Sequence, residues 1–565
     1  MDKSVHPLRV AAAVVMICAL IVVGYLNYRM ALDDPCIGSE DAAAYALLAR
    51  SLSEGRGLEM PSIWHHVRPY GSVVHQEDYW PPLQAVITAG AFALFEVDTA
   101  TAKMVNVAAY LLLVILAWLA GSWAFTPRIG LLAAAVCLAS ADLHVYAYSA
   151  RNDIIQTLLT LLGVWCLARL LATEIPQRRY AMVAGVAVGL ALLQKPLGLL
   201  LCAAGVAAFL IKAVYEQARR PGLFKAKRQV AALVIFAFFF VLLSAPYTLR
   251  NYSLYGTWLS PLGASFHSIS VKDYVEGNVR DIESDLTHKP IFKRLFPIPD
   301  NGDYYKPEVP AFAKLRYGVN ELVILGEMIR HNHIVPVVFL FLALFAWFVS
   351  SNRGRAFAAV FVLYSAATIL VVSFHVHTEQ RYYLFWIPLT AVLACGALGW
   401  MGKRSSERKD GFSRWSFAGY AVLVAGFLCF SFLLPAVQTW AEKRQQTGMH
   451  SEFLETCKAL NETLPDDAVL LTWHPLRVAW HAGRPTVLLP NEPTETICRL
   501  VWRYGVTHVI LPDGASGYPR LGGQGIEEMS GWGTIVDIPH AWVVRLKTRD
   551  LPCGIGAPPE ADPWE

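Results

Sequence analysis

The stretch VNVAAYLLLVILAWLAGSWAF, residues 105–125, decides the fold of this chain. It contains no charged residue and, as a helix, is long enough to cross the roughly 30 Å hydrocarbon core of a membrane. Similar apolar blocks occupy 10–26, 129–146, 231–246, 334–349 and 415–434. They hold the charged fraction of the 565 residues at 16%, against about 25% in ordinary soluble domains. The chain is therefore predicted to be an α-helical polytopic membrane protein.

Basic loops predict the orientation of these helices, because positively charged loops stay in the cytoplasm. The most basic loops are 215–228 and 401–414, and smaller ones are the N-terminus, 127–128, 178–179 and 353–355. They all fall on one side if the apolar run 81–97, opened by Pro81-Pro82, lies in the membrane plane or re-enters instead of crossing. About eleven spans result, at 8–26, 103–125, 129–148, 154–172, 180–194, 197–214, 229–249, 333–349, 356–374, 382–400 and 415–436. The first is interpreted as a retained anchor, since no clear small-residue cleavage site follows it.

This topology predicts two domains. Residues 1–436 form the transmembrane domain, with external loops at 27–102 and 250–332, and residues 437–565 form a soluble external domain. Predicted helices at 452–462 and 494–504 alternate there with short strands at 468–472, 487–489, 508–511, 534–538 and 542–546, which indicates a small α/β domain. A disulfide between Cys457 and Cys498 is one option for it. The small net charge of +4 does not suggest a nucleic-acid partner.

The most informative external segment is GSEDAAAYALLAR, residues 38–50. Ser39 suits an N-cap, and Glu40 and Asp41 fall in the first turn, where carboxylates interact favourably with the helix dipole. Tyr45 and the leucines after it form an apolar stripe, typical of a helix that lies on a membrane surface. Asp41 therefore either helps to cap this helix or serves a function.

Further motifs follow in order along the chain, and each falls on the external side. They are Trp80-Pro81-Pro82-Leu83, Arg151-Asn152-Asp153, the segment 189–196 with Lys195-Pro196, the segment 246–252 with Arg250-Asn251, and Gln380-Arg381-Tyr382. With the acidic pair and the Tyr four residues after Asp41, this set resembles the GT-C superfamily of glycosyltransferases. That superfamily includes the lipid A aminoarabinose transferases and the protein O-mannosyltransferases.

The resemblance implies transfer of a sugar from a polyprenyl-phosphate donor to a hydroxyl group on a glycan, lipid or protein acceptor. It implies a multi-pass protein of the plasma or bacterial inner membrane with its active site on the periplasmic or extracytoplasmic side. Asp41 is the candidate base, and Glu40 is a second candidate catalytic carboxylate. Asp153 is a third, which could also bind a metal with Asp41, orient the acceptor or cap the helix that follows.

Lys195, Arg250 and Arg381 are the candidates for binding the donor phosphate, because cations at external helix ends stabilise a leaving anion. The alternative is that they are interfacial anchors. Candidate substrate-binding residues are Tyr45, Trp80, Asn251, His377, Glu379 and Tyr382.

Two features leave the site's composition open. Trp80 stands where relatives carry a basic residue before Pro-Pro, so a phosphate contact there is not carried over. His375, His377 and Glu379 alternate, as in a metal site or a substrate-contacting strand. A divalent cation such as Mg²⁺ or Mn²⁺ is thus a possible cofactor, and loop 250–332 can act as a lid over the acceptor.

A transporter or flippase of lipid-linked sugars is the main alternative, and a non-catalytic assembly protein is another. Transporters usually have charges near the middle of their helices and an internal repeat. This sequence has few such charges and no repeat of fixed period, which favours the enzyme.

Overall fold

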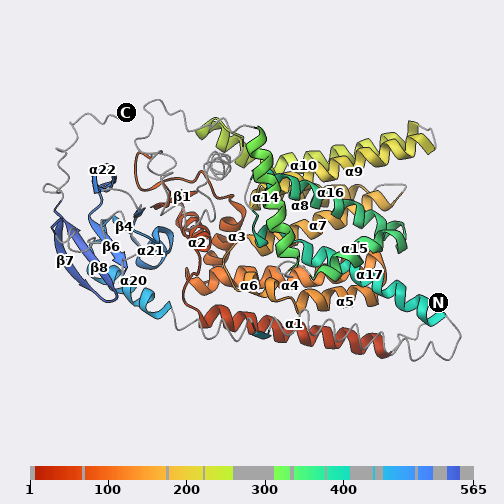
Figure 1. Cartoon of the computed structure of the whole chain (residues 1–565), viewed down its shortest axis with the longest axis horizontal. Coiled ribbons are helices and arrows are strands. Elements are labelled where there is room, and N and C mark those ends of the chain that lie inside the picture. The colour runs from red at the N-terminus through yellow and green to blue at the C-terminus, as the bar shows by residue number, and fades with distance from the viewer. Residues whose placement is uncertain are drawn as a thin grey trace.

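The computed structural model describes residues 7–65, 70–173, 177–219, 223–258, 311–330, 336–375, 378–407, 437–438, 450–489, 494–512 and 531–547. It shows a long bundle of helices with a mixed β-sheet at one end (Figure 1). The bundle side contains α1 (Pro7–Asp33), α2 (Glu40–Ser53), α3 (Leu83–Leu94), α4 (Thr99–Ala124), α5 (Pro127–Leu138), α6 (Ala141–Ala147), α7 (Asp153–Ala172), α8 (Arg178–Gln194), α9 (Leu197–Arg219), α10 (Leu223–Tyr255), α14 (Ala311–Arg330), α15 (Val337–Val349), α16 (Asn352–His375), η1 (Gln380–Tyr383) and α17 (Trp386–Glu407).

Six helices in the described part of the chain are long and apolar enough to cross a membrane, namely α1, α4, α7, α9, α10 and α16. The pair α5 and α6, bent by 63°, makes a seventh if it is one span. The chain is thus a membrane protein, as predicted. Ten of the predicted spans coincide with a helix or with this bent pair. The last, 415–436, lies outside the described residues, so the count of eleven remains a prediction.

The apolar run 81–97 contains a helix that is too short to cross. Helix α3 has 12 residues, which at 1.5 Å per residue is about 18 Å, well below the roughly 30 Å of hydrocarbon. It packs against α2 and α4 at the end of the bundle that carries the sheet (Figure 1). This length supports an in-plane helix.

The predicted loop 250–332 is not irregular throughout. Helix α10 continues to Tyr255, and α14 occupies the last part of the loop. Figure 1 shows α14 running across the bundle rather than along it. Residues 259–310 lie outside the described residues, so the predicted lid remains an expectation.

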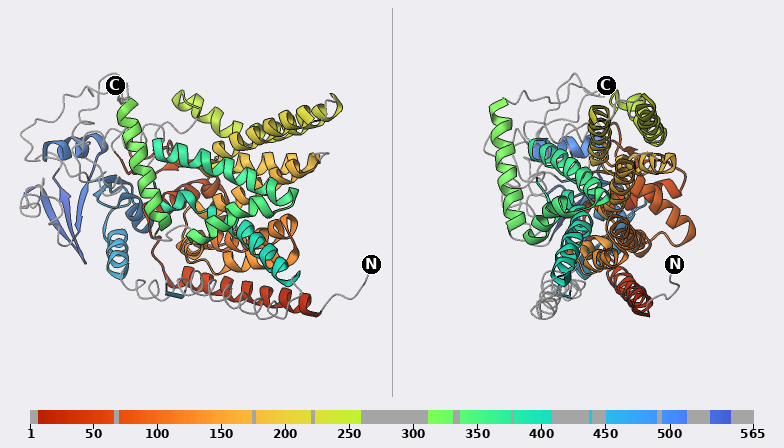
Figure 2. Two further views of the ribbon diagram at one scale, coloured as in Figure 1. Left: turned by 45° about the vertical axis from the view of Figure 1, so that its right-hand side comes forward. Right: turned by 90° about the vertical axis from the view of Figure 1, so that its right-hand side faces the viewer.

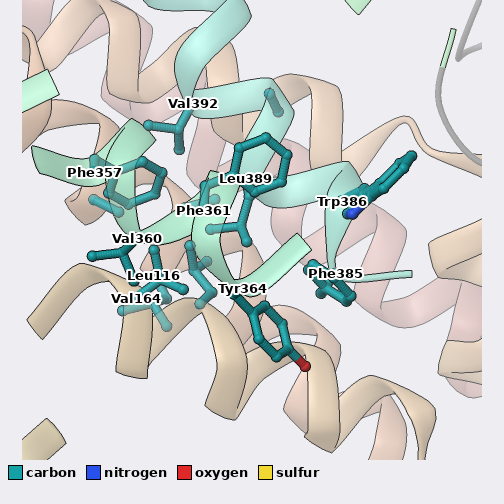
Figure 3. Close-up of a cluster of buried hydrophobic side chains, with 14 of the residues drawn as sticks. Leu116, Val164, Phe357, Val360, Phe361, Tyr364, Phe385, Trp386, Leu389 and Val392 are labelled. Atoms are coloured by element: carbon teal, nitrogen blue, oxygen red, sulfur yellow. The ribbon is translucent and has the colours of Figure 1, made fainter. Parts of the chain in front are cut away.

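The core of the bundle is formed by apolar side chains from helices that are distant in sequence. Leu116 of α4, Val164 of α7, Phe357 of α16 and Leu389 of α17 meet in one buried cluster (Figure 3). Gly121 of α4 allows the backbones of α4 and α5 to come close together, because a Cβ at this position would lie 2.9 Å from a backbone atom of α5. Tight packing of this kind is a main source of helix association in a membrane.

The C-terminal elements form the sheet and three helices. They are α20 (Ser451–Thr463), β4 (Leu470–Thr472), α21 (Pro475–Ala482), β5 (Thr486–Leu488), α22 (Thr494–Tyr504), β6 (His508–Pro512), β7 (Gly533–Ile538) and β8 (Ala541–Leu546). The sheet order is β2-β5-β4-β6-β8-β7, parallel from β2 to β6 and antiparallel from β6 to β7. The sequence analysis did not predict α21.

One strand of this sheet comes from the first external loop. Strand β2 (Ser62–Ile63) pairs in parallel with β5, while β1 (Glu59–Met60) and β3 (His75–Gln76) form a small antiparallel pair nearby in sequence. The sheet therefore contains strands from both sides of the predicted boundary at 436/437. The sheet and the start of α1 lie at opposite ends of the molecule (Figures 1 and 2).

The predicted pairing of Cys457 with Cys498 is wrong. Cys457 is a buried free thiol in α20, whereas Cys498 in α22 is disulfide-bonded. Cys457 packs among apolar side chains of α20, α21 and the sheet, where a thiol behaves as a small hydrophobic group.

Candidate active site

Asp41 lies in the first turn of α2. The helix is capped by Ser39, whose Oγ accepts a hydrogen bond from the Ala42 N–H at 3.3 Å. The Asp41 carboxylate instead pairs with two guanidinium groups, that of Arg381 and, at 3.3 Å, that of Arg151. Of the two roles considered for Asp41, capping thus belongs to Ser39, and Asp41 is directed towards cations.

Asp153 is the first residue of α7, and its side chain is fully buried. Its carboxylate pairs with the Lys195 ammonium in the turn between α8 and α9, and lies 3.4 Å from Nε of Arg151. Arg151 therefore connects the two carboxylates. The sequence analysis quoted Arg151 in a motif but did not select it, although its position next to the acidic turn was a usable signal.

Five ion pairs join six side chains into one chain of alternating charge. In spatial order they are Lys195, Asp153, Arg151, Asp41, Arg381 and Glu379. Three cations and three carboxylates balance each other, which matters because an unpaired charge in a buried site is costly. The structure thus brings together five residues that were predicted separately, from the first external loop to the segment before α17.

The electrostatic environment of the cations differs. Burial lowers the pKa of Lys195, and Asp153 acts against this shift. Burial would also lower the pKa of Arg381, but Asp41, Tyr382, Glu379 and Asp153 together outweigh burial, and the pKa lies well above its usual value. An additional anion next to Lys195 would therefore stabilise its charged form.

Distant elements hold the segment that carries Arg381. The Thr378 N–H donates to the Glu321 carboxylate of α14 at 2.5 Å. The Gln380 side-chain amide donates to Asp142 of α6 at 2.6 Å. Both contacts are made by residues just before Arg381 in sequence, and they hold the backbone that leads to Arg381, whose guanidinium reaches Asp41.

A network of neutral amides lies next to the ion pairs. Asn152 donates to the Tyr45 hydroxyl at 2.6 Å and to the Gln194 carbonyl at 2.8 Å. The Gln194 side chain donates in turn to Gln84 of α3 at 2.8 Å. Burial raises the pKa of Tyr45 well above its usual value, and Asp41 adds to the effect, so the phenol stays neutral. The sequence analysis missed the three amides, whose signal was their place at the ends of apolar helices.

Aromatic rings enclose the site. Lys195 Nζ lies 5.4 Å from the ring centroid of Tyr382, and the Arg381 guanidinium carbon lies 5.5 Å from the same centroid. Trp80 packs edge-on against Tyr45 with 5.5 Å between ring centroids. Trp80 thus contributes an aromatic ring to this side of the site.

Arg250 was predicted to bind the donor phosphate with Lys195, and Asn251 to bind substrate; the structure places the two beside the loop before Trp80. Arg250 donates to the Glu77 carbonyl at 3.0 Å and to the Asn251 side chain at 3.1 Å. The nearby Tyr255 hydroxyl donates to the Gln76 carbonyl at 3.0 Å. In this structure the end of α10 therefore holds the loop that leads to Trp80.

Glu77 in that loop is buried and accepts hydrogen bonds from the Tyr79 and Trp80 N–H groups at 2.6 Å each. Burial, and secondarily Asp78, raise its pKa from 4.5 to about 8, with Arg250 acting against the shift. Between these values the folded chain holds a proton that the unfolded chain has released. Stability is therefore expected to fall as pH rises from 4.5 towards 8, by up to about 1.4 kcal/mol per pH unit.

Apparent melting temperatures in detergent across this pH range test the expectation. Glu77→Gln keeps an oxygen acceptor and should flatten the profile, so that the variant is more stable than the wild type near pH 8. Glu54→Gln, which changes an exposed carboxylate just after α2, is the matched control. Parallel profiles for the wild type and Glu77→Gln would contradict it.

Glu40 does not join Asp41. Its carboxylate accepts a hydrogen bond from the Leu476 N–H of α21 at 3.0 Å and lies 3.3 Å from the His474 ring nitrogen Nδ1. Leu476 and His474 belong to the C-terminal elements and not to the alternating ion pairs.

The divalent cation stays a prediction, because the side chains of His375 and His377 lie outside the described residues. Among the residues that the structure describes, no three His, Cys, Asp or Glu side chains are grouped as metal ligands. Glu379 pairs with Arg381. Asp41 and Asp153 are already matched by three cations, so these residues do not fit a divalent ion.

Comparisons with known proteins agree with this architecture. Residues 80–251, less than a third of the chain, match the family model for dolichyl-phosphate-mannose-protein mannosyltransferase. The matched region begins at Trp80, so it includes Asp153 and Lys195 but neither Asp41 nor Arg381. No curated protein sequence matches the chain significantly.

Solved structures show the same fold over nearly the whole chain. Apo ArnT from Cupriavidus metallidurans is 13% identical with a TM-score of 0.55, covering 95% of this chain and 98% of ArnT. The same protein bound to undecaprenyl phosphate is 14% identical with a TM-score of 0.51, covering 94% and 97%. The apo oligosaccharyltransferase of Archaeoglobus fulgidus is 12% identical with a TM-score of 0.50, covering 88% and 69%. The predicted resemblance to GT-C glycosyltransferases is thus confirmed at the level of fold.

Proposed function

We propose that this chain, which shares the fold of GT-C glycosyltransferases, transfers a sugar from a polyprenyl-phosphate donor to an acceptor hydroxyl group. The observation that carries the proposal is the row of ion pairs in which Arg151 and Asp153 connect the candidate base Asp41 to Lys195. One site therefore offers a carboxylate for a proton and cations for a phosphate.

The reaction follows from these groups. The acceptor oxygen attacks the anomeric carbon of the sugar, the bond from that carbon to the phosphate oxygen breaks, and the hydroxyl proton passes to Asp41. The polyprenyl phosphate leaves as an anion. Lys195 and Arg381 are assigned to that anion, since charged donors already in place stabilise developing charge without reorganisation. Arg250 is assigned to hold the loop that carries Trp80.

The donor lipid and the protein's placement have separate support. Undecaprenyl phosphate occupies the structurally similar ArnT, which supports an isoprenoid phosphate carrier here. The Cys498 disulfide fits an oxidising compartment, which supports a periplasmic or extracytoplasmic location for residues 437–565. The site lies at the sheet end of the bundle and is assigned to the same side, in a plasma or bacterial inner membrane.

Transfer itself is tested by comparing a deletion strain with the same strain after re-expression of the wild-type chain. Mass spectrometry of lipids and envelope glycans from a deletion strain should show an acceptor that lacks one sugar and an accumulated lipid-linked sugar. Re-expression of the wild type should restore the product. A deletion strain with unchanged glycans and lipids would overturn the proposal, and accumulation of the donor on the cytoplasmic leaflet would favour a flippase.

Lys195→Gln is expected to weaken the binding of polyprenyl phosphate about tenfold or more, because a hydrogen bond to a charged group contributes about 1.5–3 kcal/mol. Native mass spectrometry or a lipid-competition assay with purified protein measures the affinity. Lys458→Gln, an exposed lysine on α20, is the control and should bind like the wild type. Equal affinity of the wild type and Lys195→Gln would remove Lys195 from the phosphate site.

A further inference from the structure

Helices α2 and α21 lie side by side and run in the same direction. Glu40, the first residue of α2, accepts a hydrogen bond from the Leu476 N–H in the first turn of α21 at 3.0 Å. Arg50, near the end of α2, donates to the carbonyl of Trp480 in the last turn of α21 at 3.2 Å. One helix of the first external loop thus contacts both ends of a helix that lies more than 420 residues later.

The charges at these two contacts match the dipole of α21. An acidic group is favourable at a helix N-terminus and a basic group at a C-terminus. The residue that precedes α21, His474, makes no side-chain capping hydrogen bond, so Glu40 supplies the acceptor that a cap would provide. The helix that carries Asp41 thus supplies a hydrogen-bond partner for one backbone N–H at the start of α21 and for one carbonyl near its end.

Trp480 anchors α21 in the membrane-side elements. Its side chain is 4% exposed, and its indole N–H donates to the Thr99 hydroxyl of α4 at 2.9 Å. The Arg50 guanidinium carbon lies 4.0 Å from the Trp480 ring centroid. The Phe92 ring of α3 is stacked with the Trp480 ring, with 6.1 Å between centroids. A single C-terminal side chain thus contacts α2, α3 and α4.

A second connection leads back to the first external loop. The Thr486 N–H of β5 donates to the Pro61 carbonyl at 3.1 Å, and its hydroxyl donates to the Ser62 hydroxyl of β2 at 2.8 Å. Because β5 follows α21 directly and pairs in parallel with β4, the helix contact and the strand contact belong to one β-α-β unit. Movement of this unit would displace α2.

We propose that the C-terminal elements position the catalytic helix, and that Glu40 is a positioning residue that acts through α21. The inference rests on the proposed role of Asp41, which is the next residue after Glu40. Its consequence is that loss of the Glu40 contact shifts the first turn of α2 relative to Arg151 and Arg381. Because misplacement of a reacting group by about 1 Å can cost 10²-fold in rate, the turnover number should fall while the donor KM stays unchanged.

The test compares Glu40→Ala with Glu40→Gln in the full-length protein. Hydrogen–deuterium exchange should show faster uptake in both α2 and α21 for Glu40→Ala, and kcat should fall about 10- to 100-fold with an unchanged donor KM. Glu40→Gln retains an acceptor for the Leu476 N–H and should recover most of both properties. Glu54→Gln at the other end of α2, which pairs with Arg56 and not with α21, is the matched control.

Each result decides the proposal. Uptake that rises only in α21, or in neither helix, would show that Glu40 does not connect them. Faster uptake in both helices with wild-type kcat would overturn the positioning role. A wild type without any transfer activity would remove the proposed function, and the exchange data would then still establish or exclude the contact between α2 and α21.

Discussion

Asp41→Asn is expected to lower the rate of sugar transfer by about 10²- to 10⁴-fold, the usual contribution of a general base. The amide keeps the size of the side chain but cannot accept the hydroxyl proton. Transfer from a synthetic polyprenyl-phosphate sugar, with the purified chain in detergent or nanodiscs, measures the effect.

Folding should change little in this variant, and that separates chemistry from stability. Arg151 retains Asp153 and Arg381 retains Glu379 when Asp41 loses its charge. Asp33→Asn is the matched control, since Asp33 is half-exposed in a surface pair with Arg29 and surface pairs contribute little. Wild-type transfer by a folded Asp41→Asn protein would exclude Asp41 as the base.

Asp153→Ala is expected to destabilise the protein by about 3–5 kcal/mol, because removing one partner of a buried ion pair leaves the other charge unmatched. Within the part of the chain that the structure describes, Asp153 is the ion-pair partner of Lys195. The substitution therefore leaves a buried ammonium group without its counterion. The apparent melting temperature of the purified chain, followed by tryptophan fluorescence, measures the loss.

A double variant identifies the cause of that loss. Asp153→Ala combined with Lys195→Met removes both charges, so it should be markedly more stable than Asp153→Ala although it lacks the donor site. The loss of stability in the double variant, compared with the summed losses of Asp153→Ala and Lys195→Met alone, gives the coupling of the pair. If the double variant were as unstable as that sum, the loss would come from packing and not from the ion pair.

Hydropathy and charge alone predicted much of the architecture. Apolar length predicted the helices, and the basic loops predicted that Asp41, Asp153, Lys195 and Arg381 share one end of the bundle. The ion pairs between these residues confirm that they share it. Placing all the basic loops on one side of the membrane also predicted that 81–97 does not cross, in agreement with the 12-residue length of α3. Both signals are local properties of the sequence, so they could be interpreted without knowing any contact.

The side-chain contacts of the candidate site could be predicted less completely than the helices. Arg151 was not selected, although it connects the two carboxylates. Arg250 was grouped with the phosphate-binding cations, but it holds the Glu77 loop. Glu40 was grouped with Asp41, but successive residues on a helix point in different directions, and Glu40 reaches α21 instead.

The sequence by itself determined a membrane bundle, the end at which its polar residues gather, and most of the charged side chains of the site. Only the tertiary structure decided which charge meets which, and that β2 of the first loop completes the C-terminal sheet. The physical reason is range. Hydrophobic length and loop charge act on the segment that carries them, whereas an ion pair or a strand pairing depends on two segments brought together from hundreds of residues apart. The alternating row from Lys195 to Glu379 exists only because four such segments meet.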